Sequence, residues 1–260
     1  MLRAQEVLRL YDKEMRQDPV VDPGFRAEKL GPIVRVVGRE NYIIFSDLDD
    51  RKAREVVAEQ VEYFRRSGGS VEWKVFGHDQ PGNLETILSA AGFVPDPAET
   101  LIAFDLSEGL PEGTVAVGID FRRVTDDAGI HDAVAANVAA FGPEAQDRAV
   151  AFEQRLRAPN QAVVVAYAEG APIASGRVDL PPGRSFAGLW GGGTAPDFRH
   201  RGVYRGLVHA RAVVARNAGY HFLTADALET SRPILERLGF VPLTTTRGWV
   251  FTASPSSTVV

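Results

Sequence analysis

Cysteine is absent from the 260-residue sequence, and this absence excludes several kinds of chemistry. The chain can form no disulfide, and it has no thiol to act as a nucleophile or to bind a metal. Histidine is scarce, with five residues, and no pair of histidines has the spacing with a carboxylate that metal ligands show. We therefore predict no metal site.

Long apolar runs are also missing from the sequence. No run approaches the ~20 residues that span a bilayer, and the charged start, Met1–Glu6, lacks the apolar core of a signal peptide. The net charge of −5 gives no reason to expect a surface that binds nucleic acid. We expect a cytoplasmic protein that has neither a membrane nor a nucleic acid as partner.

The length and apolar content of the chain allow one large domain or two ordinary ones. Hydrophobic residues make up 45% of the sequence, which is normal for a globular protein. The stretch 107–118, with Pro111 and three glycines, is typical of a linker. It separates predicted domains at 1–106 and 119–252, and residues 253–260 are predicted to form a flexible tail.

The stretch Thr194–Gly219 has the most distinctive pattern in the chain. A predicted strand ends at Trp190–Thr194, Pro196 breaks it, and arginines and glycines follow. Apolar side chains then recur at the spacing of one helix face. They are Val203, Leu207, Ala210 and Val214. The sequence thus predicts a strand, a short loop and an α-helix in this order.

A loop of this composition before a helix favours anion binding. Backbone N–H groups in the first helical turn lack partners, and the helix dipole adds positive charge there. Glycine lets a phosphate approach the backbone, and arginine supplies forked donors. An ordinary solvated helix start is the alternative, which the order of strand, proline, arginine and glycine disfavours. The residues predicted to contact the anion are Gly192, Gly193, Thr194, Arg199, His200, Arg201, Gly202, Val203, Tyr204, Arg205 and Gly206.

The segment Arg199–Tyr204 resembles the Arg/Gln-x-x-Gly-x-Gly/Ala loop of the GNAT superfamily of N-acetyltransferases. The resemblance implies that this loop holds the pyrophosphate of acetyl-CoA. Tyr204 stands where the family has glycine or alanine, but only its backbone N–H is needed there. Ile234–Phe240 resembles the family's penultimate helix and Gly-Phe turn, and the resemblance covers roughly residues 119–252.

An internal repeat extends the resemblance to the first half of the chain. Ile87–Pro95 matches Ile234–Pro242 at an offset of 147 (234 − 87), and the order of predicted elements agrees. The chance reuse of a common helix-stop phrase is the alternative. We expect an α/β (α+β) fold with two GNAT-like mixed-sheet domains in tandem, each a central, mostly antiparallel sheet flanked by helices.

The first copy lacks the features of a phosphate loop. Its helix is predicted to open with Asp47–Asp50, and at the same offset Gly202 corresponds to Glu55. Carboxylates suit a helix N-terminus as caps, but they repel a phosphate there. We therefore predict a degenerate N-terminal copy that does not bind CoA and that supports the other copy or shapes its acceptor cleft.

The resemblance also implies a chemistry for the second copy. In the family, an amine attacks the thioester directly, a backbone N–H of the fourth strand stabilises the oxyanion, and a base removes a proton. That strand ends here at Trp190–Thr194, where three glycines permit a bulge and close ligand approach. Leu235 occupies the position of the tyrosine that usually protonates the CoA thiolate, and it cannot serve as an acid.

The candidate catalytic residues follow from this comparison. They are Asp226 and Glu229 as bases, Asp179 as a further option, and Ser231 as a hydrogen-bond donor to the cofactor sulfur. Two of them have structural alternatives. Asp226 corresponds to Asp79 in the copy predicted to be inactive, and Ser231 could cap the helix that follows it.

The leading functional hypothesis is an acetyl-CoA-dependent N-acetyltransferase that acts on the primary amine of a small molecule. The competing hypothesis is a non-catalytic CoA- or ligand-binding scaffold with the same fold, which the missing tyrosine favours. We expect a monomer or a homodimer, because an internal duplication can replace a dimer.

Overall fold

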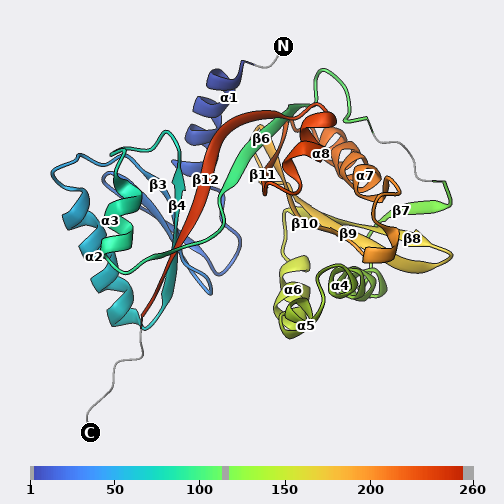
Figure 1. The fold of residues 1–260 in the computed structure, drawn as a ribbon, viewed down its shortest axis with the longest axis horizontal. Coiled ribbons are helices and arrows are strands. Elements are labelled where there is room, and N and C mark those ends of the chain that lie inside the picture. Colours follow the sequence, from blue (N-terminus) through green and yellow to red (C-terminus); the bar gives the residue numbers. More distant parts are fainter. Residues whose placement is uncertain (1–2, 113–116, 254–260) are drawn as a thin grey trace, which may run out of the picture. The chain divides into compact units, whose positions relative to one another are not determined.

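The computed structural model describes residues 3–112 and 117–253, which fall into two compact units (Figure 1). The N-terminal unit comprises residues 3–101 and 243–253, and the C-terminal unit comprises 102–112 and 117–242. Residues 113–116 of the predicted linker and 254–260 of the predicted tail lie outside the described part.

The N-terminal unit is a mixed sheet with helices packed on it. Its strand order is β1-β2-β3-β4-β12, with β3 and β4 parallel and the other neighbours antiparallel. Trp73, Phe64 and Trp249 are among the buried side chains of its core. The elements are α1 (Ala4–Tyr11), a π-helical turn (Asp12–Arg16), β1 (Arg26–Leu30), β2 (Ile33–Val37), β3 (Tyr42–Ser46), α2 (Ala53–Ser67), β4 (Ser70–Phe76), α3 (Leu84–Ala90), β5 (Val94–Pro95) and β12 (Val241–Thr252) from Leu243 onward.

The C-terminal unit repeats this arrangement. Its strand order is β7-β8-β9-β10-β11-β6, and β10 and β11 form its parallel pair. The elements are β6 (Glu99–Asp105) from Ile102 onward, β7 (Ile119–Arg123), α4 (Asp127–Phe141), α5 (Pro143–Asp147), α6 (Ala149–Leu156), β8 (Gln161–Ala168), β9 (Ala171–Asp179), β10 (Phe186–Thr194), a 3₁₀ turn (Pro196–Phe198), α7 (Val203–Asn217), β11 (Phe222–Ala227) and α8 (Arg232–Arg237). Both sheets are mixed and mostly antiparallel, which confirms the predicted fold class.

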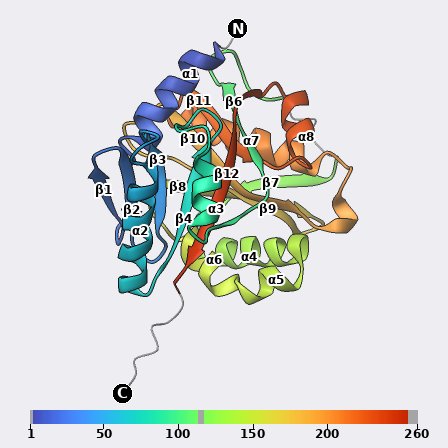
Figure 2. The ribbon, with the colours of Figure 1, turned by 60° about the vertical axis from the view of Figure 1, so that its left-hand side comes forward.

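Helices cover both faces of the C-terminal sheet. α4, α5 and α6 lie on one side of β8–β10, and α7 and α8 lie on the other (Figure 1). The turned view in Figure 2 shows the same separation. Because both faces are covered, seven consecutive residues of β8, Ala162–Ala168, are buried. None of the helices in the described part combines the length and apolar character of a bilayer-spanning segment.

Each unit takes its last strand from the other half of the sequence. β12 ends the second half, yet it pairs with β4 and places Trp249 and Phe251 in the N-terminal core. β6 ends the first half, yet it neighbours β11 and contributes Ile102 and Leu106 to the C-terminal core. The predicted domains at 1–106 and 119–252 do not include this exchange of strands. A division into two continuous segments assigns β6 to the first domain and β12 to the second.

The structure changes the correspondence between the two copies. α2 and α7 each have 15 residues and begin at Ala53 and Val203, an offset of 150 (203 − 53). Gly202 therefore corresponds to Lys52 and not to Glu55. The connection from this helix to the Gly-Phe turn is three residues shorter in the second copy, so the offset of 147 does not extend upstream. The acidic residues 47–50 precede α2 and do not form its first turn.

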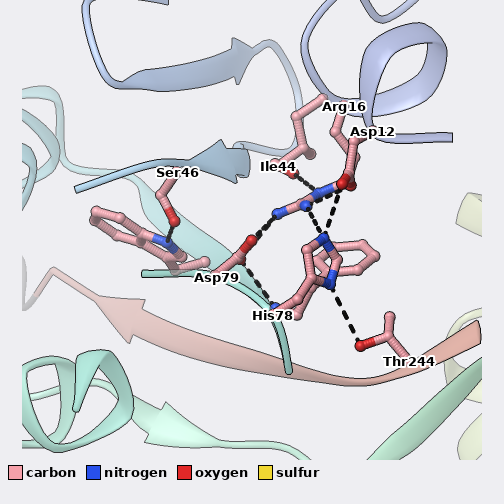
Figure 3. A network of polar contacts seen from close by, with 9 residues as sticks. Asp12, Arg16, Ile44, Ser46, His78, Asp79 and Thr244 are labelled. Atoms are coloured by element: carbon pink, nitrogen blue, oxygen red, sulfur yellow. Dashed lines mark hydrogen bonds and ion pairs between the residues drawn. The ribbon is translucent and has the colours of Figure 1, made fainter. Parts of the chain in front are cut away.

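A buried polar network joins the π-helical turn to the turn after β4 in the N-terminal unit (Figure 3). Arg16, 2% exposed, donates to both carboxylate oxygens of Asp79 at 2.7 and 2.8 Å and to Asp12 Oδ1 at 2.6 Å. The Arg16 guanidinium carbon lies 3.7 Å from the centre of the Phe76 ring, and Phe76 N–H donates to Asp79 at 3.0 Å. Asp79 is thus a structural residue in the first copy.

Asp12 makes the stability of this network depend on pH. Burial opposes ionisation, but hydrogen bonds from His78 and Arg16 and their positive charges outweigh it and hold the pKa of Asp12 below its ordinary value of 3.8. A depressed folded-state pKa stabilises the fold at pH values above the ordinary pKa. We expect this contribution to be lost as the pH falls below 3.8.

Candidate functional site

The candidate site begins where strands β10 and β11 part. Their parallel register runs from Phe186–Phe222 to Gly188–Thr224 and stops there. β10 nevertheless continues to Thr194, and β11 continues to Ala227. The carboxyl ends of two adjacent parallel strands are therefore unpaired with one another, which opens a gap in the sheet's hydrogen bonding at this edge.

β10 also bulges on its other side, against β9. Trp190 pairs with Arg177, and the next pair is Gly193 with Ser175. Residues 191 and 192 therefore oppose the single residue Gly176, which is the pattern of a β-bulge. The predicted bulge at the three glycines is thus present, and it lies beside the gap between β10 and β11.

Three glycines of this region are required for different physical reasons. Gly191 has φ = +59°, a left-handed conformation that disfavours any residue with a Cβ. A Cβ at Gly193 would lie 2.5 Å from Phe141, and one at Gly206 would lie 2.3 Å from Phe121. Gly193 and Gly206, predicted as anion contacts, are therefore fixed as glycine by helix packing whatever they contact in a complex.

The loop between β10 and α7 has two residues in the left-handed conformation. His200 and Gly202 have φ values of +62° and +80°, so left-handed residues alternate with ordinary ones before the helix begins. Backbone N–H groups arranged in this way form a concave nest for anions. From His200 to Arg205, no backbone N–H has a hydrogen-bond partner among the described residues.

The side chains around this loop have separate roles. Arg199 donates to the carbonyls of Thr194 at 3.1 Å and Ala140 at 2.8 Å, so it ties the end of α4 to the end of β10. Arg201 lies over the Phe198 ring at 5.3 Å and is exposed. Thr194 Oγ1 is buried without a hydrogen-bond partner in the described part of the chain, which leaves a polar atom available at the strand end.

The corresponding loop of the first copy satisfies its own N–H groups. The Asp49 side chain accepts from Arg51 N–H at 2.8 Å, and the Asp49 carbonyl accepts from the N–H groups of Lys52 and Ala53, both at 2.9 Å. At the offset of 150, Asp49 occupies the position of Arg199. The N-cap residue Lys52 has an ordinary φ of −97°. The two copies therefore differ in charge, in backbone conformation and in available donors.

The predicted catalytic residues lie on β11 and in the turn between β11 and α8. Asp226 is half-buried on β11, and Glu229 is exposed in the turn before α8. Ser231 is the residue before α8, its side chain makes no capping hydrogen bond, and its hydroxyl donates to the Leu228 carbonyl at 3.2 Å. Leu235 is buried in the apolar core. None of these positions supplies an evident acid in place of the tyrosine.

Asp179, the further candidate base, is paired. Arg177 donates to Asp179 Oδ1 at 2.9 Å from the same strand, β9. The Arg177 guanidinium carbon lies 5.7 Å from the centre of the Trp190 ring. Trp190 is 38% exposed, so an aromatic surface adjoins this ion pair at the bulge.

Two side chains near the bulge have roles beyond those predicted from the sequence, since Arg211 was not predicted and Tyr204 was predicted to act through its backbone N–H. Arg211 is fully buried on the face of α7 that meets the sheet, and the Tyr204 ring packs against the bulge at Gly192. The signal for Arg211 was available, because Arg211 lies one helical turn after the apolar Leu207. Burial raises the pKa of the Tyr204 phenol, because the ionised form would lose its hydration.

An open hollow of ≈ 470 Å³ lies among the helices α4, α5 and α6. Its lining is mostly apolar, and its polar members are Gln146, His131 and Glu153. The side chains of His131 and Glu153 approach to 3.8 Å. In the described residues no group of three or more His, Asp and Glu side chains is arranged to hold a metal.

Tyr167 fixes α4 to the sheet, and its titration tests that contact. Its hydroxyl donates to Asp132 Oδ2 at 2.7 Å, and burial together with this carboxylate raises the pKa of Tyr167 to about 12. The contact stabilises the fold below the ordinary tyrosine pKa of 10.0 and is lost as the pH rises toward about 12. In a titration of tyrosinate absorbance, Tyr167→Phe should remove a step at about pH 12, whereas Tyr63→Phe should keep it.

The comparisons with known proteins agree with this geometry. Residues 130–240 match the family described as Acetyltransferase (GNAT) family. A search of the curated proteins finds no match to this sequence. Among solved structures, the chain is similar to a GCN5-related N-acetyltransferase from Kribbella flavida, with 15% identity, 98% of this chain and 96% of that chain covered, and a TM-score of 0.70.

Two further structures show the same fold. One is a tandem GNAT protein from the clavulanic acid biosynthesis pathway, with 17% identity, coverage of 92% of this chain and 86% of that chain, and a TM-score of 0.61. The other is a GCN5-related N-acetyltransferase from Sphaerobacter thermophilus, with 16% identity, coverage of 96% and 85%, and a TM-score of 0.59. The fold is that of GNAT-type acetyltransferases, and residues 130–240 carry the sequence pattern of the Acetyltransferase (GNAT) family.

Proposed function

We propose that this protein is an acetyl-CoA-dependent N-acetyltransferase that acetylates the primary amine of a small molecule. The observation that carries the proposal is the set of unpartnered N–H groups from His200 to Arg205 at the start of α7. Their left-handed residues and the adjacent arginines suit a pyrophosphate. The first copy, in which Asp49 accepts from three of the corresponding N–H groups, is proposed not to bind the cofactor.

The gap between β10 and β11 is the proposed place of the acyl group. Acetyl-CoA, when bound, supplies the activated acyl carbonyl. The backbone of the bulge at residues 191–192 and the buried hydroxyl of Thr194 are the polar groups of this chain at that edge. The Trp190 ring and the hollow among α4, α5 and α6 offer apolar surface for the carbon skeleton of an amine. Asp226 and Glu229 stay as proposed bases, and a cytoplasmic location stays a prediction.

One observation favours a second candidate, a CoA-binding protein without catalysis. Leu235 is buried and apolar at the position of the family's acid, and Ser231 directs its hydroxyl to a backbone carbonyl. Loss of an acid removes one contribution to the rate, but the leaving thiolate can also take its proton from water. We therefore retain catalysis as the proposal.

Release of free CoA tests the proposal directly. The full chain is incubated with acetyl-CoA and a panel of primary amines, and the CoA thiol is quantified with a thiol reagent. The protein itself gives no background because it has no cysteine. We expect amine-dependent CoA release, with the acetylated amine identified by mass spectrometry. Tight acetyl-CoA binding without turnover of any amine would support the second candidate instead.

A further inference from the structure

Arg211 is a buried cation without a carboxylate partner. It is 1% exposed, and it forms no ion pair with any described residue. Its guanidinium donates only to backbone carbonyls, those of Leu207 at 3.1 Å, Arg177 at 3.2 Å and Trp190 at 3.4 Å. Burial lowers the pKa of Arg211 to about 10, so the group is still protonated at neutral pH.

The carbonyls that Arg211 binds flank the bulge of β10. Trp190 and Arg177 form the last regular pair before the bulge. A Cβ at Gly176 would lie 2.8 Å from Arg211 Nη1, and one at Gly192 would lie 3.0 Å from Nη2. Glycine at both positions therefore leaves room for the guanidinium beneath the bulge. A bulge locally disrupts the backbone hydrogen bonds between neighbouring strands. Arg211 takes the place of backbone donors there, because it donates to one carbonyl on each of the two strands.

The fold does not need an arginine at this helix position. At the offset of 150 between α2 and α7, Arg211 corresponds to Val61, which is buried in the apolar core of the first copy. Removing a cation from water is costly when no anion compensates it. The buried arginine occurs at this helix position only in the copy that also has the gap between β10 and β11 and the loop before α7. This coincidence indicates a functional reason for Arg211.

On the basis of the proposed function, we propose that Arg211 is a positioning residue for acyl transfer. Its guanidinium fixes the backbone of residues 191–193 beside the gap between β10 and β11. The same group brings positive charge to the region where the acyl oxygen becomes negative during attack. Fixed donors and charges of this kind act because they need no reorganisation when the charge develops.

Three variants test this role. Arg211→Met fills the site with an unbranched apolar chain, and Arg211→Lys keeps the charge but lacks the Nε donor that contacts the Leu207 carbonyl. Arg216→Met is the matched control, because Arg216 lies on the exposed side of the last turn of the same helix. Hydrogen exchange of the peptide that spans residues 189–194, acetyl-CoA affinity and kcat are measured on each variant.

We expect Arg211→Met to speed exchange in this peptide and to lower kcat by about 100-fold, with acetyl-CoA affinity within about threefold of wild type because the loop is intact. Arg211→Lys should retain part of kcat, and Arg216→Met should match wild type. Unchanged exchange and kcat in Arg211→Met would refute the role, and so would equal losses in affinity and kcat.

A second route guards against a variant that fails to fold. Gly176→Ala keeps Arg211 but places a methyl group against Nη1, so it should give the same faster exchange and the same loss of kcat. If wild type neither binds nor turns over acetyl-CoA, the proposed function fails. The exchange comparison still decides in that case whether Arg211 holds the bulge.

Discussion

Gly202→Glu is expected to weaken acetyl-CoA binding by at least about 100-fold, which corresponds to about 2.7 kcal/mol. Gly202 has φ = +80°, so any side chain there strains the backbone by about 1–2 kcal/mol. The carboxylate also stands beside the free N–H groups of residues 200–205 and repels phosphate oxygens. The first copy shows the outcome of such a contact, because the Asp49 side chain takes up an N–H group there.

A matched variant distinguishes an effect specific to the loop from the general effects of backbone strain and added charge. Gly219 follows α7 with φ = +88°, and a Cβ there meets no atom within 4 Å. Gly219→Glu therefore introduces the same strain and the same charge at the other end of the helix. Calorimetric titration of both variants and wild type with acetyl-CoA should show a loss for Gly202→Glu alone. Equal affinities for all three proteins would remove the anion loop from the proposed site.

Asp79→Asn is expected to destabilise the N-terminal unit by about 3–5 kcal/mol. The substitution keeps the shape of the side chain but leaves Arg16 buried without the anion that it contacts at 2.7 and 2.8 Å. Asp12 remains and limits the loss, because it contacts Arg16 at 2.6 Å. Urea unfolding followed by tryptophan fluorescence measures the effect, since Trp73 and Trp249 both belong to this unit.

Two controls define the cause of that loss. Glu6→Ala breaks the exposed pair with Arg3, whose side chain is 79% accessible, and should change stability by less than about 1 kcal/mol. Arg16→Met combined with Asp79→Leu removes both charges and packs against Phe45 and Phe76. This double variant should recover much of the stability. An Asp79→Asn protein as stable as wild type would show that the network adds nothing to the unit.

Several local features could be predicted from the sequence. The helix after Pro196, its αL-compatible Gly202 and the surrounding arginines follow from residue spacing and from the conformational freedom of glycine. The Gly-Phe repeats at Phe93 and Phe240 likewise indicated two copies of one fold. The buried face of α7 was predicted only in part. It includes Val203, Leu207, Gly206, Val208, Arg211, Ala212 and Ala215, whereas Ala210 and Val214 are only partly buried.

The correspondence between the copies could not be carried upstream from one repeated phrase. The connection between helix and Gly-Phe turn differs by three residues, so Glu55 was aligned with Gly202 in error. The acidic character of the first copy's loop was nevertheless visible in the sequence. Its physical effect, the satisfaction of N–H groups by Asp49, depends on backbone geometry that composition does not specify.

By itself, the sequence determined the resemblance to the GNAT family, the repeated fold and the glycine- and arginine-rich loop before α7, because each depends on residues close together in the chain. Only the tertiary structure decided where β10 leaves β11, which core receives β12, and why Gly193 and Gly206 cannot carry a side chain. It also decided that Arg211 lies beneath the bulge. These features depend on contacts between residues far apart in sequence, and neither periodicity nor local propensity records such contacts.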